Sequence, residues 1–229
     1  MSHTAVILIL ISAVTHVGWN MIGKRHHPTA AFLLVANTLG ALCLTPAMFV
    51  YRQAFGAFSA PVWGWSVLAG FSQALYYAAL AGAYQAGDIS IAYPLARSIP
   101  VILVTLISLL LGRRAQLSTQ ALVGILSIAG GSLMLPMQHF SDTRLSNYAR
   151  RVTVLALVAA LGTTGYSLAD DHALRILRTA PNLAVSSTAA TVVYAFFEGL
   201  SASIWLFLFV LARKKERHNL RDVLRAYLG

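Results

Sequence analysis

The chain has 229 residues, of which 58% are hydrophobic and 10% are charged, and its formal net charge is +10 at pH 7. Soluble domains are typically about 25% charged, so this composition excludes a water-soluble globular domain and a disordered chain. The basic residues stand in short clusters between apolar runs, which is typical of membrane proteins rather than of nucleic-acid-binding proteins.

Seven apolar runs are long enough to cross a hydrocarbon core of about 30 Å, which takes about 18 helical residues or more. In chain order they cover residues 4–22, 30–50, 62–84, 90–112, 120–137, 152–169 and 183–212. Lipid offers the backbone no hydrogen-bonding partner, and the alternating pattern of a β-barrel is missing from the sequence. The runs therefore predict an all-α integral membrane protein with seven transmembrane helices.

The first run ends with Trp19 and Asn20, which follow His16 by about one helical turn. Asn20 and Trp19 are candidates for a solute pathway. The alternatives are a hydrogen bond from Asn20 to a neighbouring helix and a place for Trp19 in the aromatic belt at the interface. His16 is a candidate proton carrier, with a packing histidine as the alternative.

The third run predicts a polar-aromatic helix face, because Gln73, Tyr76, Tyr77 and Tyr84 recur at helical spacing. Such a face is expected to line a solute pathway. The alternative is an aromatic stripe that packs inside the bundle or lies at the membrane interface.

The fourth run contains Tyr93, Pro94 and Arg97. An arginine at mid-helix costs about 2.5–3.5 kcal/mol on insertion scales, so it normally faces a cavity or a partner. A helix broken at Pro94 would expose polar backbone beside such a cavity, and Arg97 would attract anionic solutes. Alternatively, the helix starts at Pro94 and Arg97 reaches the headgroups from its first turn.

The sixth and seventh runs add three polar features. Tyr166 is a candidate pathway residue, and Glu198, near the middle of its run, is a candidate for proton coupling or for a structural hydrogen bond. Asp170 and Asp171 are expected to end the sixth span, either solvated or paired with Arg175.

The first and sixth runs contain a similar three-residue pattern, GWN at 18–20 and GYS at 165–167. In each, a small residue is followed by an aromatic residue and a small polar residue, which suggests an internal repeat. A repeat of five spans requires an inverted second copy, as in secondary transporters. Two complete units would need about three more spans than 229 residues provide, so we expect a chain truncated at its C-terminus.

The segment GDISIAYPLARS at 87–98, which leads into LLLG at 109–112, resembles EamA-type transporters of the drug/metabolite transporter superfamily. The segment at 18–24 is similar to the end of their first span. The resemblance covers one complete five-helix EamA-like unit at 4–137 and, after a linker at 138–151, the first two helices of an inverted second unit at 152–212. A basic amphipathic tail at 213–229 follows, which is expected to lie on the membrane surface.

The resemblance implies ten spans, a central cavity for small polar or amphipathic solutes, and a place in the bacterial inner membrane. It also implies cytoplasmic termini, whereas the larger number of basic residues on the side opposite the N-terminus favours an external N-terminus. Small multidrug-resistance relatives have a glutamate in the first span for proton coupling, and here the first run offers only His16 and Asn20.

These observations predict a transporter that moves small metabolites or drugs by alternating access. Two alternatives stay open: a non-transporting fragment or half-assembly that works only as a homo-oligomer, and an intramembrane enzyme on a lipid-linked substrate. The sequence shows no catalytic constellation, and His26 and His27 are adjacent rather than one turn apart. We therefore expect no enzyme, metal or cofactor. The expected partners are a small solute and membrane lipids, not nucleic acid.

Overall fold

The structure is a computed structural model that describes residues 6–7, 9–15, 18, 29–86, 89–112, 118–134 and 150–228. These residues form helices and turns and no β-strand, which confirms the all-α prediction for this part of the chain. From residue 30 onward the elements are α2 (Ala30–Cys43), α3 (Thr45–Val50), the 3-10 helix η1 (Arg52–Ala57), α4 (Ala60–Ala86), α5 (Ile89–Leu110), α6 (Thr119–Met134), α8 (Arg151–Arg178), α9 (Ser187–Ala212) and α10 (Lys214–Leu228).

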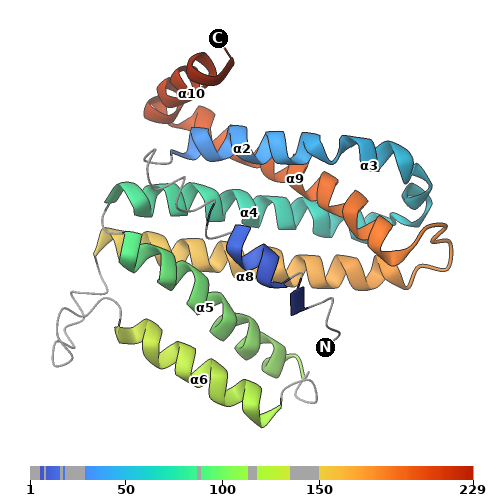
Figure 1. Cartoon of the computed structure of the whole chain (residues 1–229), viewed down its shortest axis with the longest axis horizontal. Helices are drawn as coiled ribbons and strands as arrows, with labels where there is room; N and C mark the ends of the chain where they lie inside the picture. Colours follow the sequence, from blue (N-terminus) through green and yellow to red (C-terminus); the bar gives the residue numbers. More distant parts are fainter. Residues whose placement is uncertain are drawn as a thin grey trace.

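The long helices run back and forth in one bundle, with α4 near its centre (Figure 1). α4 packs on α8 and on α9, and α2 packs on α9. α5 packs on α8, and α6 lies beyond α5 at the edge of the bundle. One end of the bundle therefore holds the end of α4, the start of α8 and the junction between α9 and α10.

Small residues bring α4 into backbone contact with both of its main neighbours. A Cβ atom added at Gly162 of α8 would lie 2.7 Å from the backbone oxygen of Ser72 and the backbone nitrogen of Tyr76 on α4. A Cβ atom added at Gly70 of α4 would lie 2.7 Å from the backbone nitrogen of Ala202 on α9. Close contact of this kind holds helices together in lipid, where apolar burial alone gives little preference for a helix over an acyl chain.

Among the described residues, three helical segments are long and apolar enough to span a membrane: Ala30–Val50, α8 and α9. Two shorter apolar stretches, Pro94–Leu110 and Thr119–Gly131, lie in α5 and α6. α4 has 27 residues, but serine, glutamine and tyrosine side chains interrupt its apolar sequence. Part of the first predicted span and residues 138–149 of the predicted linker lie outside the described residues.

The expectations about Pro94 were wrong in both forms, because α5 neither breaks nor starts at this residue. The helix begins at Ile89 and continues through Pro94 and Pro100 to Leu110. The hydroxyl of Ser98 donates a hydrogen bond of 2.7 Å to the backbone oxygen of Pro94. Arg97 therefore lies two turns into the helix rather than in its first turn.

The basic tail forms α10, which is fixed to the start of α2 by a buried carboxylate. Glu216 is 7% exposed, and its Oε2 accepts a hydrogen bond of 3.2 Å from the backbone nitrogen of Ala31. Beside it, the Thr29 hydroxyl accepts one of 3.1 Å from the backbone nitrogen of Phe32. The positive end of the helix dipole stabilises a carboxylate at this position.

Candidate functional site

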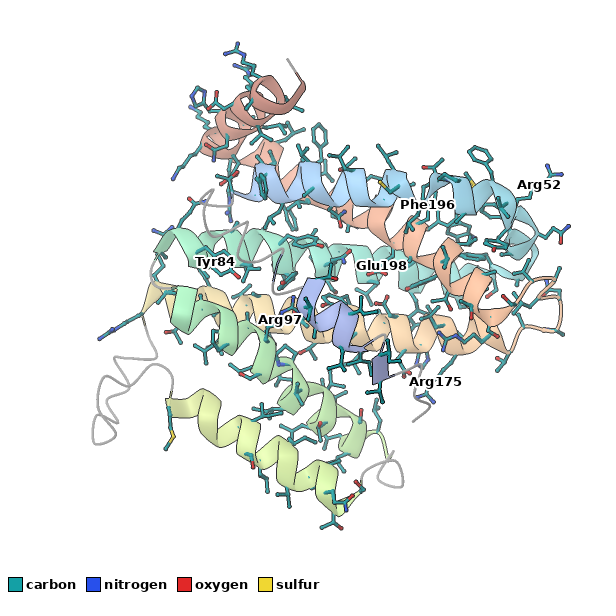
Figure 2. The ribbon with its side chains drawn as sticks, viewed as in Figure 1. Arg52, Tyr84, Arg97, Arg175, Phe196 and Glu198 are labelled. Atoms are coloured by element: carbon teal, nitrogen blue, oxygen red, sulfur yellow. The ribbon has the colours of Figure 1, made fainter. Side chains whose placement is uncertain are left out.

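Arg97 of α5 is held inside the bundle by an aromatic side chain of α4. Its Nη2 donates a hydrogen bond of 3.2 Å to the hydroxyl of Tyr76, and its guanidinium carbon lies 5.6 Å from the centre of the Tyr76 ring. This distance is within the range of a cation–π contact. Figure 2 shows Arg97 on α5 near α4 and α8. The half-buried arginine is thus stabilised by a phenol and by a ring face.

Tyr76 also links this arginine to two further predicted pathway residues. The rings of Tyr76 and Tyr166 of α8 lie edge to face with their centres 6.2 Å apart, and Tyr77 lies 5.2 Å from Tyr76. Tyr76 is 5% exposed. The missing side chain at Gly162 allows the backbone of α8 to lie against α4 at this point. The structure therefore brings together Arg97, Tyr76, Tyr77 and Tyr166 from three helices.

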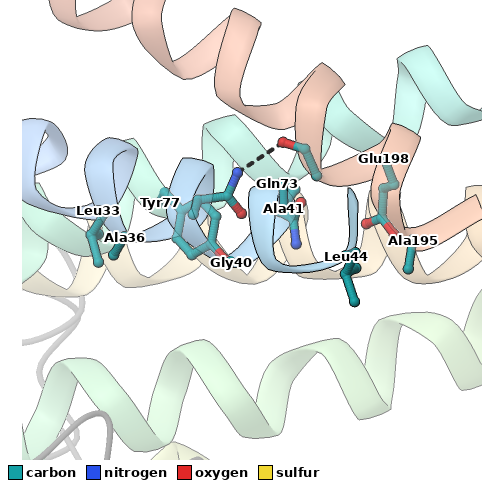
Figure 3. A pocket seen from close by; sticks show the side chains of 11 residues that line it. Leu33, Ala36, Gly40, Ala41, Leu44, Gln73, Tyr77, Ala195 and Glu198 are labelled. Carbon is teal, nitrogen blue, oxygen red and sulfur yellow. Dashed lines mark hydrogen bonds between the residues drawn. The ribbon is translucent and has the colours of Figure 1, made fainter. Parts of the chain in front are cut away.

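A cavity of about 380 Å³ lies between α2, α4 and α9 (Figure 3). Its polar lining comes from Gln73 and Tyr77 on α4, Glu198 on α9 and Asn37 on α2. The rest of its lining is small or aliphatic: Leu33, Ala36, Gly40, Ala41, Leu44, Ala195 and Gly199.

The polar lining residues differ in how far the described residues satisfy their hydrogen-bonding groups. Gln73 has a buried Oε1 with no hydrogen-bond partner among the described residues. Asn37, in contrast, donates through Nδ2 to the backbone oxygen of Gly199 and to the hydroxyl of Ser203, both at 2.9 Å. Asn37 therefore ties α2 to α9, whereas Gln73 has a buried amide oxygen without a partner among the described residues and Glu198 adds a carboxylate to the lining.

The single polar face predicted for the third run is divided in the structure. Gln73 and Tyr77 line the cavity, whereas Tyr76 contacts Arg97 on another side of α4. Tyr84 packs with apolar residues of α8 and α5 nearer the end of α4. Arg97 and Tyr166 are outside the lining of the cavity. Their assignment to a solute pathway stays a prediction.

Asp170, which was expected to be solvated or paired with Arg175, is a second carboxylate near Glu198. Asp170 was expected at the end of the sixth span, but α8 continues to Arg178 and Asp170 lies inside the helix. The Tyr194 hydroxyl donates a hydrogen bond of 2.9 Å to Oδ1 of Asp170. Tyr194 lies one turn before Glu198 on α9, and Asp170 is within electrostatic range of Glu198.

Of the two alternatives for the acidic pair, solvation or an ion pair with Arg175, the ion pair is confirmed for Asp171. Nε of Arg175 lies 2.9 Å from Oδ1 of Asp171 at the surface of α8. Consecutive helical residues point about 100° apart, so Asp170 cannot share this surface position with Asp171. This 100° separation is the sequence signal for Asp170: if Asp171 pairs with Arg175 at the helix surface, the carboxylate of Asp170 must point elsewhere.

Several predicted site residues lie outside what the structure describes. His16, Trp19 and Asn20 of the first run are among them. Tyr93 belongs to α5, but its side chain is outside the described part. Pro94 is half-buried in the same helix. The described residues contain no group of three or more His, Cys, Asp or Glu that could hold a metal ion.

Comparisons with protein-family models, with curated proteins and with solved structures returned no match for this chain.

Proposed function

We propose that the chain is a membrane transporter of small metabolites or drugs, of the EamA type, and that it works by alternating access. In this proposal all seven apolar runs span the membrane, including α4, α5, α6 and the first run. The membrane is the bacterial inner membrane. The resemblance at 87–98 and the three helical segments that are long and apolar enough to span a membrane support this proposal.

One observation favours transport above other functions: a cavity with a carboxylate, an amide and a phenol lies between apolar helices. Polar and ionisable side chains within membrane-spanning helices are costly, and they mark pathways for solutes and protons. Glu198 is the twelfth of the 26 residues of α9, so it lies near the middle of a predicted span. A purely structural bundle gains nothing from placing Glu198 beside a cavity of about 380 Å³.

The lining favours a solute that donates hydrogen bonds, such as an organic amine. The Gln73 oxygen lacks a partner among the described residues, and Glu198 adds a carboxylate. An anionic solute attracted by Arg97 was the expectation from the sequence. Arg97 instead contacts Tyr76 and stands outside the cavity lining, so we propose an amine as substrate class.

Glu198 is also our candidate for proton coupling. In this proposal an amine and a proton compete for its carboxylate, as in an exchanger that releases one when it binds the other. The titratable groups that interact electrostatically with it are Tyr77 on α4, Tyr166 and Asp170 on α8, and Tyr194 on its own helix. His16, the other candidate from the sequence, lies outside the described residues.

Flux into liposomes that contain the purified full chain tests the proposal. Two labelled probes are compared under an imposed pH gradient: the diamine putrescine and the dicarboxylate succinate. We expect putrescine to enter faster than succinate, and Glu198→Gln to reduce its entry at least ten-fold. Glu216→Gln, which neutralises a carboxylate outside the cavity, is the matched control and should retain uptake.

Three outcomes would count against this proposal. Fluxes equal to those of protein-free liposomes would argue against a carrier for these solutes and favour a non-transporting fragment. Faster entry of succinate would contradict the amine class. If the probe were recovered as a chemically altered product, the result would favour an intramembrane enzyme.

A further inference from the structure

A second and larger cavity, of about 660 Å³, lies at the end of the bundle where α10 begins. Its inner wall is apolar and comes from three helices: Leu75 and Gly82 on α4, Leu155 and Val158 on α8, and Phe209 on α9. This cavity shares only α4 and α9 with the candidate substrate cavity, and none of its lining residues.

The rim of this cavity concentrates positive charge. Arg151 is the first residue of α8, Arg213 lies between α9 and α10, and Lys215 lies in the first turn of α10. All three side chains are exposed. Nζ of Lys215 donates a hydrogen bond of 3.2 Å to Oε1 of Gln85 at the end of α4, which holds the ammonium group at the rim.

The acidic lining residue of this cavity does not neutralise that charge. Glu216 is buried, and its Oε2 accepts a hydrogen bond from the backbone nitrogen of Ala31, so its charge is directed to the start of α2. Three cationic side chains thus share the rim with one lining carboxylate, that of Glu216, which already accepts a hydrogen bond from the start of α2. Such an arrangement favours binding of an anion that neutralises the excess positive charge.

The dimensions of the cavity fit a lipid better than a small ion. From Gln85 at the rim to Leu75 on the inner wall, α4 rises about 15 Å at about 1.5 Å per residue. α8 has 28 residues and is therefore about 42 Å long, against a hydrocarbon core of about 30 Å. If α8 spans the membrane, Arg151 at its first position would lie at headgroup level, and Leu155, Val158 and Leu75 would lie progressively deeper. A free phosphate would leave that apolar wall uncovered.

We infer that this cavity binds one anionic phospholipid, with the phosphate at Arg151, Arg213 and Lys215 and an acyl chain along the wall formed by α4, α8 and α9. Basic pockets between membrane helices are typical sites for acidic lipid headgroups. This inference concerns a site separate from the substrate cavity and does not depend on transport. The bound lipid would join α8 and α9 to α10 at the membrane surface.

Native mass spectrometry of the full-length chain, titrated with phosphatidylglycerol or with phosphatidylcholine, tests this inference. We expect one phosphatidylglycerol to stay bound and phosphatidylcholine to bind more weakly. Lys215→Gln should lower the affinity for phosphatidylglycerol about five-fold, and the triple variant R151Q/R213Q/K215Q should lower it about 100-fold.

Two matched variants separate a built site from general attraction to a basic surface. The triple variant R217Q/R221Q/R225Q removes the same charge from exposed positions of α10 outside the cavity and should retain binding. Leu155→Trp fills the apolar wall without changing charge and should abolish binding. Equal losses in the two triple variants, or full binding in Leu155→Trp, would overturn the inference.

Inorganic phosphate distinguishes a lipid from a free anion. An excess of phosphate should leave the bound phosphatidylglycerol in place, because phosphate cannot cover the apolar wall. Displacement by phosphate would show a site for free anions and overturn the assignment to a lipid. Circular dichroism checks that each variant retains its helices, and Lys215→Gln, with its exposed side chain, provides the test if the triple variant does not fold.

Discussion

The hydroxyl of Tyr194 on α9 donates a hydrogen bond of 2.9 Å to Oδ1 of Asp170 on α8, so a phenol supports a carboxylate inside the bundle. Tyr194 is 1% exposed and packs with Ala173, Leu177 and Val193. Because Tyr194 is buried, its hydroxyl needs a partner within the protein, and the half-buried carboxylate of Asp170 accepts its hydrogen bond.

Tyr194→Phe should lower the free energy of unfolding by about 1–3 kcal/mol, because it leaves a partly buried carboxylate without its donor. Thermal unfolding in detergent, followed by circular dichroism, measures the change. Tyr51→Phe removes a hydroxyl from a residue that is 39% exposed, and it should leave the midpoint temperature of unfolding unchanged. Equal shifts in the two variants would show that the bond to Asp170 contributes nothing.

Gly162→Ala should destabilise the contact between α4 and α8 by about 1–3 kcal/mol, because the new methyl group would overlap the backbone of Ser72 and Tyr76. The control is Gly64→Ala on α4, where the described residues place no atom within 4 Å of the added Cβ, apart from the helix's own backbone and the two chain neighbours. Gly64→Ala should raise the free energy of unfolding by up to about 1 kcal/mol, because alanine has a higher helix propensity than glycine. Thermal unfolding should therefore give shifts of opposite sign, and a neutral Gly162→Ala would contradict close helix contact.

Arg97 and Tyr76 should be energetically coupled. A double-mutant cycle with Tyr76→Phe and Arg97→Gln should give a coupling energy of about 1.5–3 kcal/mol, which is typical of a hydrogen bond to a charged group. Tyr76→Phe keeps the ring and its cation–π contact, so the cycle reports on the hydroxyl. If the two substitutions changed the free energy of unfolding additively, the contact between Arg97 and Tyr76 would contribute nothing to stability.

Gln73→Leu should lower solute uptake while leaving the protein equally stable or more stable by about 1 kcal/mol. The substitution removes a buried acceptor that has no partner among the described residues, and such groups destabilise the fold. Uptake in liposomes and thermal unfolding are measured on the same preparation. Gln85→Leu makes the same change outside the substrate cavity and should retain uptake. A loss of stability with normal uptake would indicate a packing role for Gln73.

The sequence placed the helices well but not the partners of their polar side chains. It put Gln73, Tyr76 and Tyr77 on one face of a helix, and spacing alone could not show that α9 covers one part of that face and α5 another. Arg97 was recognised as a residue that needs a partner, yet its partner Tyr76 depends on how α4, α5 and α8 cross. Asp170 was missed because an acidic pair at the end of an apolar run is usually solvated.

The amino-acid sequence by itself determined that the chain forms apolar helices of membrane-spanning length, because a backbone in lipid must satisfy its own hydrogen bonds and only long apolar segments meet that requirement. Tertiary structure decided which polar groups meet. Gly162 and Gly70 set how closely α8 and α9 approach α4, in a bundle where Glu198 and Gln73 line one cavity and Arg97 contacts Tyr76. Side-chain neighbours across helices follow from the crossing of backbones, which the apolar pattern of one helix does not specify by itself.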